Sequence, residues 1–184
     1  MHETDAALLA AALQERGTGR AEAFERILLR YEKLIHHIAR RYFANAEDAL
    51  DASQEAVLRV YKGLPNLRLD AEATLKAWIC TVTANVCLDE LRKKRPHTVE
   101  EAPETAAVET SAEEQAAARE RVREILAALH QLPGPQRMVL ILRDMQGLSY
   151  EELAVALEIS VGTVKSRLSR AREALRKLLP ENFW

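Results

Sequence analysis

The sequence contains few of the residues that interrupt helices. Only six glycines and six prolines occur among its 184 residues, and runs of β-branched residues are rare. Alanine, leucine, glutamate and arginine dominate instead, and most of these favour helices. No alternating strand pattern competes with the helical periodicity anywhere. We therefore predict an all-α fold.

Cysteines and long apolar runs are also scarce. The two cysteines, Cys80 and Cys87, form no CxxC pair and fall seven residues apart on one predicted helix. Their Cα atoms would be about 10 Å apart, too far for a disulfide. No apolar run approaches the roughly 20 residues that span a bilayer, and the polar segment Met1–Asp5 is unlike a signal peptide. We expect a protein of the reducing cytoplasm with no membrane segment of its own.

Patterns of catalytic and metal-binding residues are missing as well. The sequence has no Ser/His/Asp set, no glycine-rich phosphate loop and no paired catalytic carboxylates. None of its five histidines has a Cys, Asp or Glu at a spacing typical of metal ligands. We expect a protein that is not an enzyme and that has no cofactor.

Basic residues are absent from one stretch of the chain. His97–Ala118 contains six acidic residues and no Lys or Arg. From Arg119 onward there are eleven basic and eight acidic residues, and six of the basic ones fall between Lys165 and Lys177. The net charge of −2 therefore averages an acidic tether with a basic C-terminal region.

Apolar periodicity and helix-breaking residues divide the chain into two sets of four helices. We expect them at residues 5–16, 20–43, 47–64, 71–95, 113–131, 135–145, 150–157 and 161–179. The third helix carries Leu50, Val57, Leu58 and Tyr61. The fourth has apolar stripes on two sides, which predicts a central helix with one open edge.

The segment between the two sets of helices has a different composition. Thr98–Ala112 contains Pro, Thr, Glu and Ala with little apolar periodicity, which is typical of a flexible linker. We therefore predict two small helical domains, 1–96 and 119–184, joined by a flexible acidic linker at 97–118.

The clearest local motif begins at Gly147. Ser149 and Glu152 have the spacing of a capping box, which starts a short helix. The three residues Glu158–Ser160 then form a turn into a second helix. A short helix, a tight turn and a second helix are typical of a helix-turn-helix, whose second helix enters the DNA major groove.

Helical geometry separates the two faces of this second helix. At about 100° per residue, an inward-facing stripe consists of Val164, Leu168, Ala171 and Leu175. The opposite face carries Lys165, Ser166, Ser169 and Arg170, with Arg172 and Arg176 at its border. Such side chains contact base edges or phosphates. On its own, a basic helix face is also consistent with a solvated surface.

The N-terminal half carries two weaker patterns. Asp51, Gln54 and Glu55 lie near the start of a helix, where acidic residues bind a basic partner or merely complement the helix dipole. On the fourth helix, Trp78, Asn85 and Arg92 recur every seven residues, with Thr81 beside them. These side chains suit base stacking, base hydrogen bonding and phosphate contact, although a tryptophan is also a common core residue.

Both halves resemble one family. The run LPGPQRMVLILRDMQGLSYEELAVALEISVGTVKSRLSRAREALRKLL, from Leu132 to Leu179, resembles domain four of the sigma-70 factors, most closely the extracytoplasmic-function (ECF) group. The stretch Ala23–Arg95, with its DALDASQEAVLRVYKGLPNL and LKAWICTVTANVCLDELRKKR segments, resembles domain two. The resemblance covers about two thirds of the chain, in the order and spacing of the family.

The resemblance implies a role for each group of residues. Binding of the clamp helices of RNA polymerase falls to Asp51, Gln54 and Glu55. Recognition of the minus-ten promoter element falls to Trp78, Thr81, Asn85 and Arg92, with Asn85 holding an unpaired base. Recognition of the minus-thirty-five element falls to Lys165, Ser166, Ser169, Arg170 and Arg172. Leu75 stands where the family usually has an aromatic residue, so the segment that melts DNA is poor in aromatic side chains.

The resemblance also implies partners. They are core RNA polymerase, contacted at its clamp and flap, promoter DNA, and an anti-sigma factor. Two alternatives remain open: a two-domain regulator that binds DNA without polymerase, and a helical adaptor whose basic helix is only a solvated surface. Response-regulator output domains also contain a helix-turn-helix.

Overall fold

A computed structural model describes residues 4–14, 18–67, 74–93 and 112–180, and within them the regular structure is entirely helical. The N-terminal bundle consists of α1 (Asp5–Gln14), α2 (Thr18–Tyr42), α3 (Ala46–Gly63) and α4 (Leu75–Lys93), with a 3-10 turn at Leu64–Asn66. The C-terminal bundle consists of α5 (Ala112–Gln131), α6 (Gly134–Leu140), α7 (Tyr150–Ala156) and α8 (Val161–Leu178). A π-helical turn, Ile141–Met145, continues α6.

Most of the helix ends agree with the sequence prediction, and side-chain caps fix several of the starts. The Asn45 side chain accepts a hydrogen bond of 2.7 Å from the Glu47 amide at the start of α3. The Ser160 hydroxyl accepts one of 3.1 Å from the Thr163 amide at the start of α8. Helix α4 is described from Leu75, four residues after its predicted start, and the intervening residues 71–73 lie outside the described part of the chain.

The predicted linker at 97–118 can be compared with the structure only at its end. Residues 97–111 lie outside the described residues, as do residues 94 and 95 at the predicted end of the fourth helix. Residues 112–118 are helical and form the start of α5, so this helix begins inside the segment assigned to the linker. The start of α5 is one residue before the helix start that the periodicity predicts.

Small residues form the inner face of α3. Ala49, Ala52 and Ala56 are fully buried against the rest of the bundle, together with Val60. The large apolar residues of the predicted helix mostly lie on the opposite side. Their exposed fractions are 48% for Leu50, 51% for Leu58 and 46% for Tyr61. Alanines allow the helices to pack closely here, and the leucines are left at the surface.

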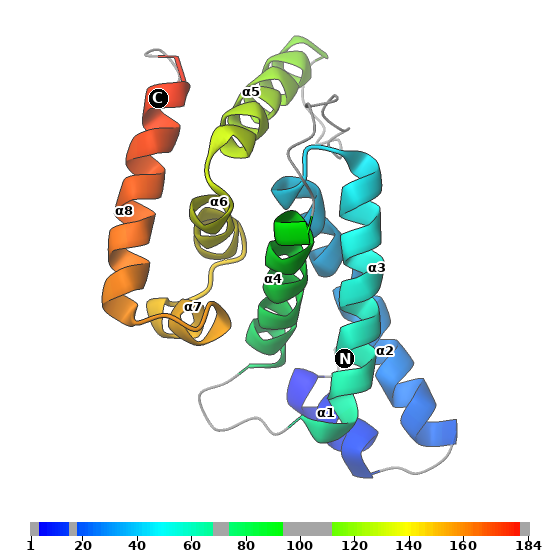
Figure 1. The fold of residues 1–184 in the computed structure, drawn as a ribbon. Helices are drawn as coiled ribbons and strands as arrows, with labels where there is room; N and C mark the ends of the chain where they lie inside the picture. The colour runs from blue at the N-terminus through cyan, green and yellow to red at the C-terminus, as the bar shows by residue number, and fades with distance from the viewer. Residues whose placement is uncertain (1–3, 15–17, 68–73, 94–111, 181–184) are drawn as a thin grey trace.

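Helix α4 lies at the centre of the molecule, as its two apolar stripes predicted (Figure 1). One side carries Leu75, Ile79 and Val86, which are buried in the N-terminal bundle. The other carries Cys80 and Cys87, which are also fully buried. Helix α4 contacts α2 and α3 of its own bundle and α6 and α7 of the C-terminal bundle.

The helix-turn-helix forms as predicted. The Ser149 hydroxyl accepts a 3.0 Å hydrogen bond from the Glu152 amide, and the Glu152 carboxylate accepts one of 2.7 Å from the Ser149 amide. Glu158 in the turn has a φ of 53°, in the left-handed region that closes tight turns. The inward stripe of α8 is buried at Val164, Leu168 and Ala171.

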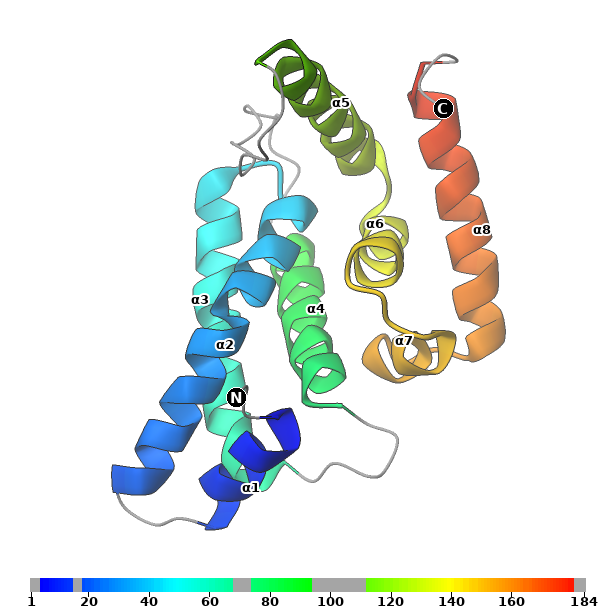
Figure 2. The same cartoon turned by 180° about the vertical axis from the view of Figure 1, so that it is seen from behind.

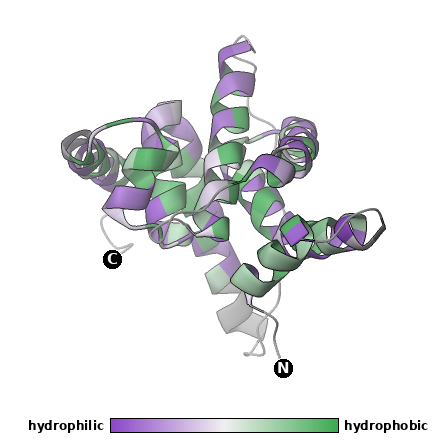
Figure 3. Ribbon diagram, turned by 90° about the horizontal axis from the view of Figure 1, so that it is seen from below, coloured by the Kyte–Doolittle hydropathy of each residue, from purple (hydrophilic) through white to green (hydrophobic). Residues whose placement is uncertain are grey.

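The two bundles pack against each other. Helix α2 contacts α5 and α6, and α4 contacts α6 and α7, so the C-terminal bundle covers one side of α4 (Figure 2). Hydrophilic residues follow the outer sides of the helices, while hydrophobic residues gather where the helices meet (Figure 3). Among the described helices, none is both long and apolar enough to cross a membrane.

Candidate functional site

The predicted DNA-facing side of α8 lies at the surface. Lys165, Ser166, Ser169 and Arg170 are all exposed, and the Ser160 cap fixes the start of their helix. The Arg170 guanidinium donates hydrogen bonds of 3.3 Å to the Ser166 carbonyl and hydroxyl oxygens. This arrangement aligns a cation and a hydroxyl one turn apart on the exposed side of α8.

Arg172 differs from its neighbours because it is paired within the protein. Its guanidinium donates hydrogen bonds of 2.5 and 3.3 Å to the Asp144 carboxylate, and this contact raises the pKa of Arg172. The pair links α8 to the π-helical turn that precedes the helix-turn-helix. Arg172 therefore holds α8 in place, and part of its charge is already balanced.

A groove of about 1050 Å³ runs along the same side of α8. Its lining includes Tyr150, Lys165, Ser169, Arg172 and Arg176. The Lys165 ammonium lies 5.9 Å from the centroid of the Tyr150 ring. The predicted base-contacting residues thus divide between two edges of the exposed face: Lys165 and Ser169 border the groove, whereas Ser166 and Arg170 do not line it.

The acidic motif of α3 is only partly free. Asp51 and Gln54 are exposed, whereas the Glu55 carboxylate accepts a 2.7 Å hydrogen bond from Arg59. The Arg59 guanidinium also lies 3.4 Å from the Asp89 carboxylate of α4. Its hydrogen bond with Glu55 raises the pKa of Arg59. Glu55 therefore takes part in a surface network between α3 and α4 as well as in the predicted binding surface.

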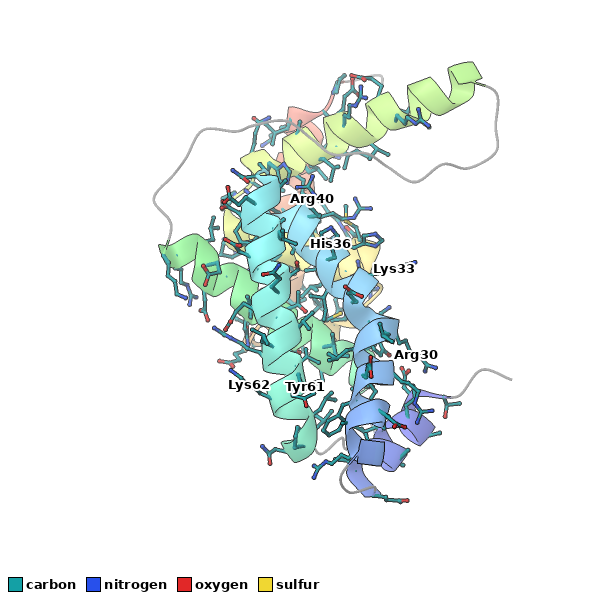
Figure 4. The ribbon with its side chains drawn as sticks, turned by 90° about the vertical axis from the view of Figure 1, so that its right-hand side faces the viewer. Arg30, Lys33, His36, Arg40, Tyr61 and Lys62 are labelled. Atoms are coloured by element: carbon teal, nitrogen blue, oxygen red, sulfur yellow. The ribbon has the colours of Figure 1, made fainter. Side chains whose placement is uncertain are left out.

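A second groove, of about 460 Å³, lies between α2 and α3. It is lined by Glu32, His36, Leu50, Ser53, Gln54, Val57 and Leu58. Basic side chains follow α2 beside it, including Lys33, His36 and Arg40 (Figure 4). The sequence pattern predicted a surface site at Gln54 but did not indicate that Leu50 and Leu58 are exposed. The alanine spacing at 49, 52 and 56 was the signal that the opposite face of α3 is the buried one.

The four predicted minus-ten residues lie on a third side of α4. Trp78, Thr81 and Asn85 are partly exposed, and Arg92 is exposed. At about 100° per residue, Trp78 and Asn85 point more than 120° away from Cys80, which faces the C-terminal bundle. The open edge predicted for this helix is therefore present.

Trp78 and Leu75 are held by packing. A Cβ atom added to Gly63 would lie 2.8 Å from Cζ2 of Trp78, so the indole ring rests directly on the end of α3. Leu75 is only 2% exposed and belongs to the core. It offers no surface on which an unstacked base could rest.

The two cysteines are structural. Both side chains are fully buried, and burial raises the pKa of each thiol to about 12. A protonated, inaccessible thiol is unreactive. No group of three or more potential metal ligands occurs in the described part of the chain.

Comparison with known families identifies both bundles. Residues 27–97 match Sigma-70 region 2 and residues 122–175 match Sigma-70, region 4. The chain is 36% identical to the ECF RNA polymerase sigma factor SigM of Mycobacterium tuberculosis, over 97% of this chain and 86% of that protein. It is 35% identical to the RNA polymerase sigma-H factor of Pseudomonas aeruginosa, over 88% of each chain.

Solved structures agree on the fold. The structure of CnrH in complex with the cytosolic domain of CnrY superposes with a TM-score of 0.66, at 24% identity over 95% of this chain and 96% of that one. The sigma factor RpoE of Bartonella quintana, in complex with the anti-sigma factor NepR, gives 0.70 at 24% identity over 86% and 98%. The chain belongs to the sigma-70 family. Within that family it is an ECF RNA polymerase sigma factor.

Proposed function

We propose that this protein directs core RNA polymerase to specific promoters and helps to open them for transcription initiation. The observation that carries the proposal is the presence on one chain of both sigma regions, each with its predicted nucleic-acid side exposed. Helix α8 presents Lys165, Ser166, Ser169 and Arg170 to solvent, and α4 presents Trp78, Thr81 and Asn85. Each set combines donors and, on α4, an aromatic ring suited to base contact.

The two bundles divide the work between them. Residues 1–96 act as sigma domain two, with Asp51, Gln54 and Glu55 on the polymerase clamp and the open edge of α4 on the minus-ten element. Residues 119–184 act as sigma domain four, with α8 on the minus-thirty-five element and this domain docked on the polymerase flap. An acidic linker at 97–111 lies between them, and residues 112–118 of the predicted linker belong to α5. The guanidinium of Arg172 is already paired with Asp144, so we assign this residue to phosphate contact and not to base recognition. Its contact with Asp144 also holds α8 in place.

Partners and location follow from the same proposal. The protein acts in the cytoplasm as a non-enzymatic subunit, needs no cofactor and is held by an anti-sigma factor when it is not in use. Two proteins of similar fold were solved with a bound partner: RpoE with the anti-sigma factor NepR, and CnrH with the cytosolic domain of CnrY.

Run-off transcription tests the proposal. Core polymerase with this protein should produce defined transcripts from genomic fragments that core polymerase alone does not transcribe. A regulator of the kind left open by the sequence would instead bind duplex promoter DNA without polymerase and support no transcription. An adaptor would bind no DNA under either condition. Either of these two results would overturn the proposal.

A further inference from the structure

The first residue of α7 places an aromatic ring beside the start of α8. Tyr150 directly follows the Ser149 cap, and the capping box with Glu152 fixes where α7 begins. Helix α7 lies across the start of α8 (Figures 1 and 2), and the Ser160 cap fixes that start in turn. The Tyr150 ring is partly exposed and packs against the core. Its position beside α8 is therefore set by two capped helices.

Two cations lie near the face of this ring. The guanidinium carbon of Arg143 is 4.8 Å from the centroid of the Tyr150 ring, and the Lys165 ammonium nitrogen is 5.9 Å from it. Arg143 also donates a hydrogen bond to the Leu148 carbonyl oxygen, which ties it to the loop before α7. Attraction to a ring face holds a cation without cancelling its charge, whereas a carboxylate would cancel it. Lys165 is thus held in place with its charge still available to another partner.

Other charged groups near Lys165 in the groove are paired within the protein. The Arg172 guanidinium donates hydrogen bonds of 2.5 and 3.3 Å to Asp144. The Glu173 carboxylate accepts one of 2.8 Å from Lys177. In the described part of the chain, the Lys165 ammonium has the ring as its neighbour and no carboxylate within ion-pair distance. The groove therefore carries an uncancelled positive charge beside the ring.

Lys165 does not point in the same direction as the residues expected to read bases. At about 100° per residue, it lies about 100° around α8 from Ser166 and about 140° from Arg170. Lys165 lines the groove, whereas Ser166 and Arg170 do not. In a helix-turn-helix the first helix crosses the DNA backbone while the second lies in the major groove. The edge of α8 that borders Tyr150 of α7 is therefore the edge that meets a strand of phosphates.

We propose that Tyr150 is a positioning residue that holds Lys165 on a backbone phosphate beside the minus-thirty-five element. The ammonium then contributes affinity, while Ser166 and Arg170 contribute base recognition. A lysine ammonium is a compact point charge that suits a phosphate oxygen, and it carries no sequence information there. The inference rests on the proposed function, because it takes α8 as the helix in the major groove. It moves Lys165 from the predicted base-contacting residues to those that contact the DNA backbone.

The salt dependence of DNA binding measures this contact without polymerase. The free full-length chain is titrated with a fluorescent duplex at several KCl concentrations, and each phosphate contact adds about 0.9 to the slope of log K against log salt. Lys165→Met keeps an apolar stem and should lower the slope by about 1. Tyr150→Leu should lower it by about the same amount, whereas Tyr150→Phe keeps the ring and should keep the slope. Arg121→Met, at an exposed site of α5, loses the same charge and should leave the slope unchanged.

A scan of single phosphates locates the contact on a promoter. Promoter duplexes found by run-off transcription carry one uncharged methylphosphonate at a time across the minus-thirty-five element. With the unchanged chain and core polymerase, one substitution should weaken binding about tenfold, as the loss of one charge-assisted hydrogen bond would. The same substitution should have little further effect in Lys165→Met or Tyr150→Leu. Lys165 and Arg176 are about 16 Å apart along α8, so Arg176→Ala should lose its effect at a different phosphate.

Several results would overturn the inference. A changed ranking of minus-thirty-five sequences in Lys165→Met would show that Lys165 contacts a base. An unchanged slope in this variant would leave the edge of α8 to a partner other than DNA, such as an acidic protein. An unchanged slope in Tyr150→Leu would show that the ring does not position the lysine, and Tyr150→Met replaces this variant if circular dichroism shows that it is unfolded.

Failure of the proposed function would be visible separately. Absence of transcripts with the unchanged chain and core polymerase would overturn that function, while the salt titration of the free chain would still decide the phosphate contact. A chain that bound no duplex DNA, free or with polymerase, would overturn both.

Discussion

The guanidinium group of Arg137 lies over the ring of Tyr42, with Cζ 5.3 Å from the ring centroid, and donates a hydrogen bond to the carbonyl oxygen of the same residue. Replacing Arg137 with Met keeps an apolar stem but leaves the carbonyl oxygens of Tyr42, Leu129 and Leu132 without this donor. We expect the free energy of unfolding to fall by about 3 kcal/mol. Urea unfolding measures the change, and Arg121→Met at an exposed site of α5 should cost no more than about 0.5 kcal/mol. Equal losses in the two variants would contradict this role.

His130 should make stability depend on pH. Burial, followed by the nearby charge of Arg137, lowers its pKa to about 4, although a hydrogen bond with the Arg41 backbone opposes the shift. In the unfolded chain the pKa returns to about 6.5, so the unfolded state binds more protons between pH 6.5 and 4. The stabilising contribution is complete above pH 6.5 and is lost as the pH falls toward 4.

The loss should amount to about 2 kcal/mol once the partial exposure of the ring is taken into account. Unfolding in urea at pH 7.5 and pH 5.0 measures it, and His130→Gln should show a smaller decrease over the same interval. Carboxylates contribute equally to both proteins and cancel in the comparison. An identical decrease in the variant would rule out His130 as the source.

Polymerase binding should depend on the charges of α3. The double variant Asp51→Lys with Glu55→Lys reverses two of the predicted clamp-facing charges, and we expect core polymerase to be lost from pull-downs. The change also removes the Glu55–Arg59 pair, but an exposed pair of this kind contributes no more than about 1 kcal/mol, so the helices should remain folded. Glu22→Lys with Glu25→Lys, at exposed positions of α2, makes the same charge change and should retain binding. Undiminished binding by the α3 variant would contradict the assignment of Asp51 and Glu55 to the polymerase-binding surface.

Base recognition and phosphate contact should separate along α8. Arg170 lies at the middle of α8 on its exposed face, one turn from Ser166, whereas Arg176 lies nearly two turns further along and lines the groove beside Tyr150. A base contact is worth about 1–3 kcal/mol of discrimination, whereas a phosphate contact affects all sequences alike. Arg170→Ala should therefore change the ranking of a library of minus-thirty-five sequences in a reporter assay. Arg176→Ala should lower activity nearly uniformly across the library. An unchanged ranking for Arg170→Ala would contradict base contact by Arg170 and would require a different rotation of α8 in the DNA major groove.

The elements that could be predicted from the sequence are those set by local chemistry. Capping by Ser149 and Ser160 fixes the starts of α7 and α8, and the period of Val164, Leu168 and Ala171 fixes the inner face of α8. These signals lie within one or two helical turns of the residues that they determine. The sequence pattern was therefore sufficient for the helix-turn-helix and its exposed side.

The features that could not be predicted depend on distant segments. Nothing near Arg137 indicates that it binds the end of a helix 95 residues earlier, because a single arginine has no periodicity. The exposure of Leu50 and Leu58 was not predicted because their side chains give a signal, but a misleading one. Large apolar residues suggest burial, but on α3 many of the buried positions are alanines, which carry little hydrophobic signal of their own.

Leu50, Leu58 and Tyr61 of α3 stay about half exposed, so the packing of the two bundles does not cover them. A strip of this kind favours association with other proteins, including further copies of the same chain. A cell that makes more of this protein than its partners can bind would contain free copies with an exposed apolar strip. Chaperones and proteases would act on these copies, and the strip would favour their aggregation. The usable amount would then be set by the supply of partners rather than by how well the chain folds.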